Sequence, residues 1–166
     1  IAGQHGVYLI ECEGITAFGN TTQNCPLSAF KLQLENYAGQ MALAEPRLHL
    51  HGFSYTGNTV RNCLDGLAVI STSLSDGTDQ KVFGLVVSGN TIESVTQDGM
   101  VLNHCVNANI GVNTINGAAR CGINFRNSSG KFSSNTILKT GSSGVYISAY
   151  DDVELNDNTL VDVGLN

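Results

Sequence analysis

The dipeptide Asn-Thr recurs six times along the chain, and its spacing limits the possible folds more than any other feature of the sequence. Its asparagines are Asn20, Asn58, Asn90, Asn113, Asn135 and Asn158. Successive asparagines lie 38, 32, 23, 22 and 23 residues apart. The last three intervals define a unit of 22–23 residues, and the first two equal that unit with about 15 and 9 residues inserted. A fixed period in this range indicates a protein built from stacked repeats.

Apolar and polar residues alternate on both sides of each asparagine. Two residues after it stand Thr22, Val60, Ile92, Ile115, Ile137 and Leu160. A second alternating run opens eight or nine residues after most asparagines, at Gly66, Gly99, Gly122 and Gly144. Alternation with a period of two predicts strands, about three per unit, such as 145–149, 153–155 and 159–163 in the last unit. No amphipathic helix fits beside three strands in 22 residues.

These patterns predict an all-β protein: a parallel β-helix, or solenoid, of about six coils of 22–23 residues. The inserted residues fall in coils two and three, around positions 35–46 and 71–80. A leucine-rich repeat is the competing fold, because residues 153–160 satisfy its core pattern. The rest of each unit alternates like a second strand, however, and leucine does not dominate the apolar positions.

We expect the six asparagines to mark one corner of each coil and to form a single ladder along the solenoid. Asparagine tolerates the left-handed backbone conformation that a sharp corner requires. Its side chain can also hydrogen-bond to the coils above and below. The pattern therefore predicts a structural role for these residues and no catalytic one.

Neither end of the sequence resembles a capping unit. Residues 1–6 enter a coil at once, and residues 159–166 finish a third strand. A solenoid exposes an unpaired sheet edge and an open apolar core at each end unless further units cover them. We therefore expect residues 1–166 to be a single β-helix segment of a longer chain.

Charge and cysteine usage exclude several classes of function. The net charge is −6, and the eight Lys and Arg residues form no cluster, so we expect no nucleic-acid partner. No apolar run approaches ~20 residues, so we expect no membrane insertion. The five cysteines are odd in number and scattered, which gives neither a disulfide framework nor a zinc pattern. We expect no metal site and no cofactor.

The coil length, the three-strand pattern and the asparagine ladder resemble the pectate-lyase-like right-handed parallel β-helix superfamily. Within it, phage tailspikes and capsule depolymerases are the most similar in pattern. The resemblance covers nearly the whole chain. It implies the fold more strongly than an activity, because the superfamily includes lyases, hydrolases, epimerases and non-catalytic fibres. It also implies a homotrimer, a location in a virion tail or outside the cell, and a bacterial polysaccharide as partner.

Two aspartates are the candidate catalytic residues. Asp65 and Asp98 each stand directly before the glycine that opens a coil, in adjacent coils. Stacked strands lie ~4.8 Å apart, which is near the ~5–5.5 Å separation of the carboxylates in retaining glycosidases. Crowding of like charges would raise the pKa of one of them and supply a general acid. The alternative is that each Asp-Gly pair only makes a turn.

The first strand of each coil places two columns of side chains on the outer surface. One column holds Tyr8, Lys31, Ala68, Val101, Asn124 and Tyr146, and the other holds Ile10, Gln33, Ile70, Asn103, Arg126 and Ser148. Aromatic, amide and basic groups together can hold sugar rings by stacking and hydrogen bonding. The candidate substrate-binding residues are Lys31, Gln33, Asn103, Asn124, Arg126 and Tyr146. The same face could instead pack against neighbouring subunits.

The sequence therefore predicts a tailspike-like β-helix that binds and degrades a bacterial surface polysaccharide. It does not separate a glycoside hydrolase from a polysaccharide lyase. One alternative is a non-catalytic β-helical fibre or adhesin shaft. Another is a uronate epimerase of the same fold.

Overall fold

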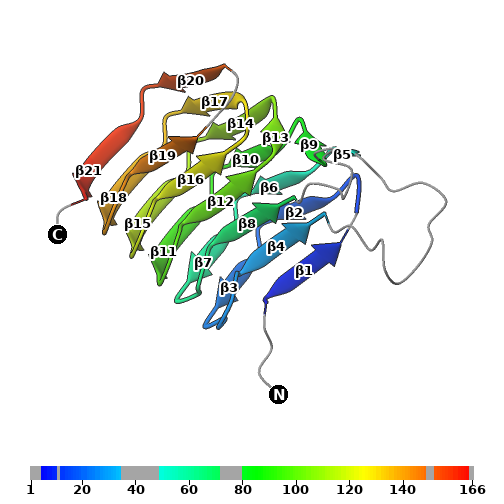
Figure 1. Ribbon diagram of the computed structural model, residues 1–166. Coiled ribbons are helices and arrows are strands. Elements are labelled where there is room, and N and C mark those ends of the chain that lie inside the picture. Colours follow the sequence, from blue (N-terminus) through cyan, green and yellow to red (C-terminus); the bar gives the residue numbers. More distant parts are fainter. Residues whose placement is uncertain (1–4, 11, 35–48, 72–79, 149–151, 165–166) are drawn as a thin grey trace.

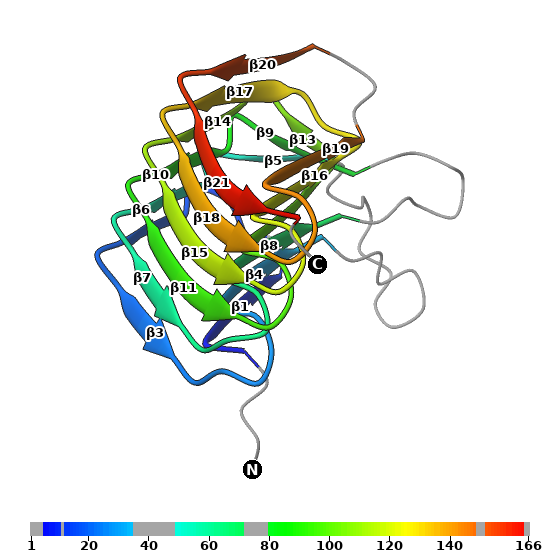
Figure 2. The ribbon, with the colours of Figure 1, turned by 90° about the vertical axis from the view of Figure 1, so that its left-hand side faces the viewer.

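Stacked parallel strands form the walls of the molecule. The computed structural model describes residues 5–10, 12–34, 49–71, 80–148 and 152–164, and these contain strands and no helix. Each strand pairs in parallel with its equivalents in the neighbouring coils. Figures 1 and 2 show six coils stacked along one axis, each following nearly the same path around a shared core. The predicted parallel β-helix is confirmed.

Three six-stranded sheets run the length of the solenoid. Sheet A contains β1 (Val7–Ile10), β4 (Phe30–Gln33), β8 (Leu67–Ile70), β12 (Met100–Asn103), β16 (Ile123–Arg126) and β19 (Val145–Ser148). Sheet B contains β2 (Thr16–Phe18), β6 (Ser54–Thr56), β10 (Val86–Ser88), β14 (Ala108–Gly111), β17 (Gly130–Ser133) and β20 (Val153–Asn156). Sheet C contains β3 (Thr21–Gln23), β7 (Thr59–Arg61), β11 (Thr91–Val95), β15 (Thr114–Ala118), β18 (Thr136–Thr140) and β21 (Thr159–Val163).

A fourth, smaller sheet was not predicted from the sequence. Sheet D contains β5 (His49–His51), β9 (Lys81–Phe83) and β13 (Cys105–Val106), so coils two to four each carry one extra short strand between sheets A and B. The two predicted insertions, around positions 35–46 and 71–80, fall almost entirely outside the described residues. Among the described residues, no helix has the length and apolar character that a membrane span requires.

The core consists of columns of apolar side chains that stack from coil to coil. Along sheet A, the register places Leu32, Val69, Leu102 and Phe125 in one such column, and all four are fully buried. Burying a side chain of this size contributes about 1.5–3 kcal/mol. Because side chains alternate along a strand, this inward column fixes the neighbouring residues on the outer surface.

The predicted asparagine ladder is present. Each side-chain amide donates a hydrogen bond to the side-chain oxygen of the next asparagine, as from Asn90 to Asn113 at 2.8 Å and from Asn113 to Asn135 at 2.9 Å. From the second asparagine onward, each amide also donates to a backbone carbonyl of the preceding coil, as from Asn113 to Val87. The ladder therefore joins all six coils.

The expected reason for asparagine at this corner was wrong. None of the six ladder residues adopts a left-handed backbone conformation. That conformation belongs to the residue before each of them: Gly19, Gly57, Gly89, Val112, Ser134 and Asp157. Asparagine is required here for its side-chain hydrogen bonds, and the turn is made by its predecessor.

Candidate functional site

The outer face of sheet A has the register that the sequence predicted. One outward column runs Tyr8, Lys31, Ala68, Val101, Asn124 and Tyr146, and the second runs Ile10, Gln33, Ile70, Asn103, Arg126 and Ser148. All six candidate substrate-binding residues therefore belong to one surface of the solenoid.

A pocket of about 280 Å³ opens on this face over the third, fourth and fifth coils. It is lined by Asp65, Ile70, Gln97, Asp98, Val101, Asn103, Arg120, Asn124 and Arg126. It thus brings together both candidate catalytic residues and three of the candidate substrate-binding residues. Gln97 and Arg120 were missed by the sequence analysis. Gln97 directly precedes Asp98, and Arg120 holds the equivalent place one coil later.

Asp65 lies on the floor of the pocket with 8% of its surface exposed. One carboxylate oxygen accepts a hydrogen bond from the backbone amide of Asp98 at 3.2 Å, and the other accepts one from the Ser28 hydroxyl at 3.2 Å. Burial raises the pKa of Asp65, although these two hydrogen bonds favour the charged form. The nearby charge of Asp98 raises the pKa further.

Asp98 lies one coil further along with 2% of its surface exposed. Its Oδ1 accepts the backbone amide of Cys121 at 2.9 Å, and its Oδ2 accepts the side-chain amide of Asn124 at 2.9 Å. The Arg120 guanidinium stands 3.9 Å from Oδ1 and is itself half exposed. Asp98 therefore has three neighbours that donate a hydrogen bond to its carboxylate or attract it, whereas Asp65 has no cation of its own within ion-pair distance among the described residues.

Asn124 differs from its expected placement on the open surface. It is only 3% exposed, because its side chain lies between two partners. Its amide donates to Asp98, and its oxygen accepts a hydrogen bond from Arg126 Nε at 2.8 Å. Arg126 remains exposed and extends over the ring of Tyr146, 5.5 Å from the centroid. Asn124 therefore connects the exposed Arg126 to the buried Asp98.

The remaining candidates lie on either side of the pocket. The Tyr8 hydroxyl donates to Gln33 Oε1 at 2.9 Å, and Lys31 Nζ stands 5.0 Å from the Tyr8 ring centroid. Neither Lys31 nor Gln33 lines the pocket. Asn103 does line it, and its amide lies 3.4 Å from the Ser71 carbonyl.

His104 directly follows β12 and has a structural role. Its backbone is left-handed and its ring is buried. The ring nitrogens lie 2.7 Å from the Ser71 hydroxyl and 3.1 Å from the Asn127 amide. Both nitrogens are thus engaged with neighbouring loops.

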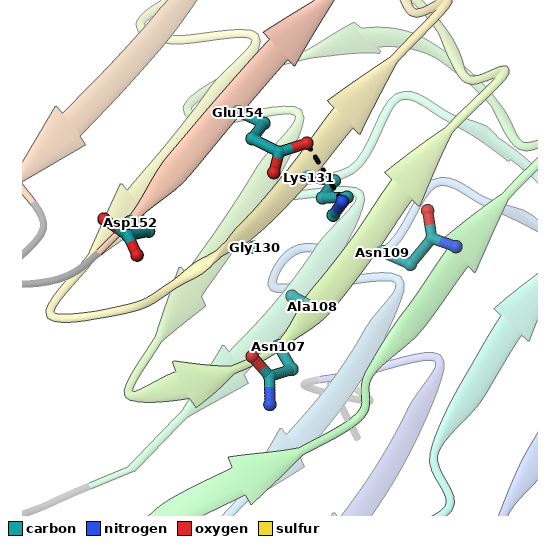
Figure 3. Close-up of a pocket in the computed structure, with 7 residues that line it drawn as sticks. All are labelled: Asn107, Ala108, Asn109, Gly130, Lys131, Asp152 and Glu154. Carbon is teal, nitrogen blue, oxygen red and sulfur yellow. Dashed lines mark ion pairs between the residues drawn. The ribbon is translucent and has the colours of Figure 1, made fainter.

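A second pocket, of about 410 Å³, lies on the outer face of sheet B. Figure 3 shows its lining residues, with Asn109 and the Lys131–Glu154 ion pair along adjacent strands. That ion pair spans 3.0 Å and is exposed. This pocket is larger than the one on sheet A. Its single lysine is paired with a carboxylate, and no aromatic residue lines it.

The donor groups that a transition metal would need do not cluster. The four histidines and five cysteines of the chain all lie among the described residues. No three His, Cys, Asp or Glu side chains of the described chain gather around one point. His49 and His51 share one face of β5, but both rings pack against Phe83, at 5.0 and 5.2 Å between centroids.

The fold and the stacked asparagine ladder define this chain as a right-handed parallel β-helix protein of the pectate-lyase-like class. Residues 1–164 match the family model described as "Periplasmic copper-binding protein (NosD)". The chain belongs to the NosD family. No curated protein and no solved structure matches the chain.

Proposed function

We propose that this protein binds a polysaccharide along the outer face of sheet A and hydrolyses its glycosidic bonds, with Asp65 and Asp98 as the catalytic residues. The observation that carries the proposal is the pocket of about 280 Å³, which is lined by both Asp65 and Asp98. Amide and guanidinium donors from Gln97, Asn103 and Arg126 surround the same space. Such donors bind sugar hydroxyls by hydrogen bonding.

The two carboxylates have environments that suit different roles. Burial raises the pKa of Asp65, which favours a protonated group that donates its proton to the leaving glycosidic oxygen. Asp98 accepts hydrogen bonds from the Asn124 side chain and the backbone amide of Cys121, and the Arg120 guanidinium lies 3.9 Å from it. Asp98 would attack the anomeric carbon or activate a water. Adjacent coils are ~4.8 Å apart, and this spacing predicts retention of the anomeric configuration.

The assay uses acidic and neutral polysaccharides and measures new reducing ends together with the ultraviolet absorbance of unsaturated uronates. Hydrolysis gives reducing ends without that absorbance. The substitutions Asp65→Asn and Asp98→Asn should each lower the rate by about 10²–10⁴-fold and leave polysaccharide binding intact. Asp162→Asn, at an exposed residue of β21 in sheet C, is the matched control. Full activity in both variants would contradict the proposal and leave the aspartates as turn residues.

Other outcomes of the same assay would favour the alternatives. Ultraviolet absorbance with loss of activity in the aspartate variants would identify a lyase that uses Arg120 or Arg126 to neutralise a uronate. Binding without any turnover would identify a non-catalytic shaft. Association into a homotrimer is a separate prediction, which sedimentation of the protein would test.

The family description supports a location outside the cytoplasm, because it is given as periplasmic. Nothing in the comparisons supports a virion tail.

The same family description names copper. The donor set of this chain does not fit a copper site, because copper is held by thiolate, thioether or imidazole groups that converge, and the described residues provide no such group of three. We therefore derive no function through copper, and a copper titration of the purified protein should show no stoichiometric binding.

A further inference from the structure

Two tyrosine–cation pairs lie at opposite ends of the outer face of sheet A. In the first and second coils, Lys31 Nζ stands 5.0 Å from the ring centroid of Tyr8. In the fifth and sixth coils, the Arg126 guanidinium stands 5.5 Å from the ring centroid of Tyr146. Both rings are partly exposed, at 41% for Tyr8 and 43% for Tyr146. Each pair therefore presents an aromatic surface and a positive charge to solvent.

The aspartates lie between these pairs. Asp65 belongs to the third coil and Asp98 to the fourth, and the pocket opens above them. Tyr8 and Tyr146 share one outward column and are separated by five coil spacings of ~4.8 Å, or roughly 24 Å. A ligand that lies along the solenoid axis above the aspartates therefore meets one pair on each side.

Lys31 and Arg126 differ from three other cations of the described chain, because no carboxylate neutralises their charge. Arg61, Arg120 and Lys131 each have a carboxylate within ion-pair distance. Within the described residues, neither Lys31 nor Arg126 has one. The chain as a whole carries a net charge of −6. A face with two cations that have no acidic partners is therefore more positive than the rest of the molecule. These cations favour a ligand with negative charges.

The charges of the aspartates do not oppose such a ligand strongly. Both carboxylates lie at the pocket floor and are almost fully buried. Arg120 stands beside Asp98 and is half exposed, so it covers that charge toward solvent. The other polar groups that line the pocket are amides and guanidinium groups, beside the aliphatic side chains of Ile70 and Val101.

We infer that the ligand is an acidic polysaccharide, with one acidic group bound by Lys31 and another by Arg126, and that cleavage occurs inside the chain between them. This inference rests on the proposed function and names its substrate class and mode of attack. An enzyme that holds substrate on both sides of its reacting groups cleaves internal bonds. It therefore shortens the polymer quickly while releasing few reducing ends.

The test compares binding of polygalacturonate, alginate and hyaluronate with binding of dextran, a neutral glucan. Asp98→Asn protein is used so that binding is measured without turnover. We expect acidic polymers to bind and dextran not to bind. Lys31→Ala and Arg126→Ala should each weaken binding of the acidic polymer by about tenfold, as expected for loss of one hydrogen-bonded charge. Lys131→Ala removes the same charge from sheet B and should leave binding unchanged.

The outcomes separate this inference from the proposed function. Equal binding of dextran, or equal weakening by Lys131→Ala, would overturn the acidic ligand on sheet A and leave the proposed hydrolysis standing. Binding of none of the four polymers would overturn the proposed function itself. Release of monosaccharides without a fall in viscosity would overturn internal cleavage alone, because it shows attack from a chain end.

Discussion

Two columns of polar residues run between the coils, and they are built differently. The asparagine ladder has the same residue in all six coils, and its four central members are almost fully buried. The second column, at the corner before sheet A, changes from coil to coil: His5, Ser28, Asp65, Asp98, Cys121 and Ser143. Carboxylates occur there only in the third and fourth coils.

This difference separates a structural column from a candidate site. A neutral amide both donates and accepts, so stacked asparagines satisfy one another. Carboxylates only accept, and two of them in adjacent coils repel each other. The same corner is made with serine at Ser28 and Ser143, so the turn does not require an acid. Groups that disfavour the local structure concentrate at functional sites.

The largest expected effect is on the asparagine ladder. Asn113→Ala removes the side-chain partner of the buried backbone amide of Asn90 and of the Val87 carbonyl, and it also takes one hydrogen bond each from the side chains of Asn90 and Asn135. Each group that loses its partner costs about 1–3 kcal/mol, so we expect a loss of at least about 3 kcal/mol in the free energy of unfolding. Asn20→Ala, at the exposed end of the ladder, should cost less than about 1 kcal/mol. Equal losses in denaturant unfolding would contradict the ladder as a source of stability.

A smaller effect of opposite sign is expected at the aspartate column. Asp65 has a raised pKa in the folded protein, so its contribution to stability is greatest at low pH and is lost as the pH rises through that pKa. Asp65→Asn removes this titration and keeps both hydrogen bonds, because the Ser28 hydroxyl can accept as well as donate. The melting temperature of the variant should therefore exceed that of the unmodified protein at pH 7, by a margin that shrinks toward pH 3.

The pH series needs one control. Asp162→Asn alters an exposed carboxylate and should show no margin that grows with pH. A margin for Asp65→Asn that is constant with pH would show that folding leaves the pKa of Asp65 unshifted, and a margin that grows as the pH falls would show that the folded protein favours the charged carboxylate. Either result would remove the physical distinction between the two polar columns.

The smallest effect is expected at an outward ion pair. Arg61 and Glu93 lie in adjacent coils of sheet C, with 2.6 Å between Arg61 Nε and Glu93 Oε2, and both side chains are exposed. Exposed pairs contribute about 0–1 kcal/mol. Arg61→Ala should therefore change the free energy of unfolding by less than about 1 kcal/mol. A larger loss would mean that outer columns stabilise the solenoid as the inner ladder does.

Periodicity was sufficient to predict the coils, the ladder and both outward columns, because one apolar face fixes the strand register. It did not predict sheet D, whose strands in coils two and three follow the irregular insertions and carry no repeat. It also gave the wrong reason for the ladder, since backbone conformation at the corner depends on the preceding residue, whose identity varies.

Within the candidate site, the sequence predicted which residues share a face but not how deep each lies. Asn124 follows the outward alternation and is nevertheless buried, because Arg126 and Asp98 enclose its amide. Arg120 was missed because it stands in a turn outside the alternating strands. Its proximity to Asp98 depends on coil stacking, which brings together residues 22 positions apart.

A polysaccharide bound above Asp65 and Asp98 on sheet A would be visible directly. The most direct measurement is a crystal structure of the Asp98→Asn variant soaked with oligosaccharides from the polymer that binds best. Sugar density should cross the pocket above both positions, with Lys31 toward one end of the oligosaccharide and Arg126 toward the other. Sugar density in the sheet B pocket beside Lys131, with the sheet A face empty, would contradict the proposed binding site.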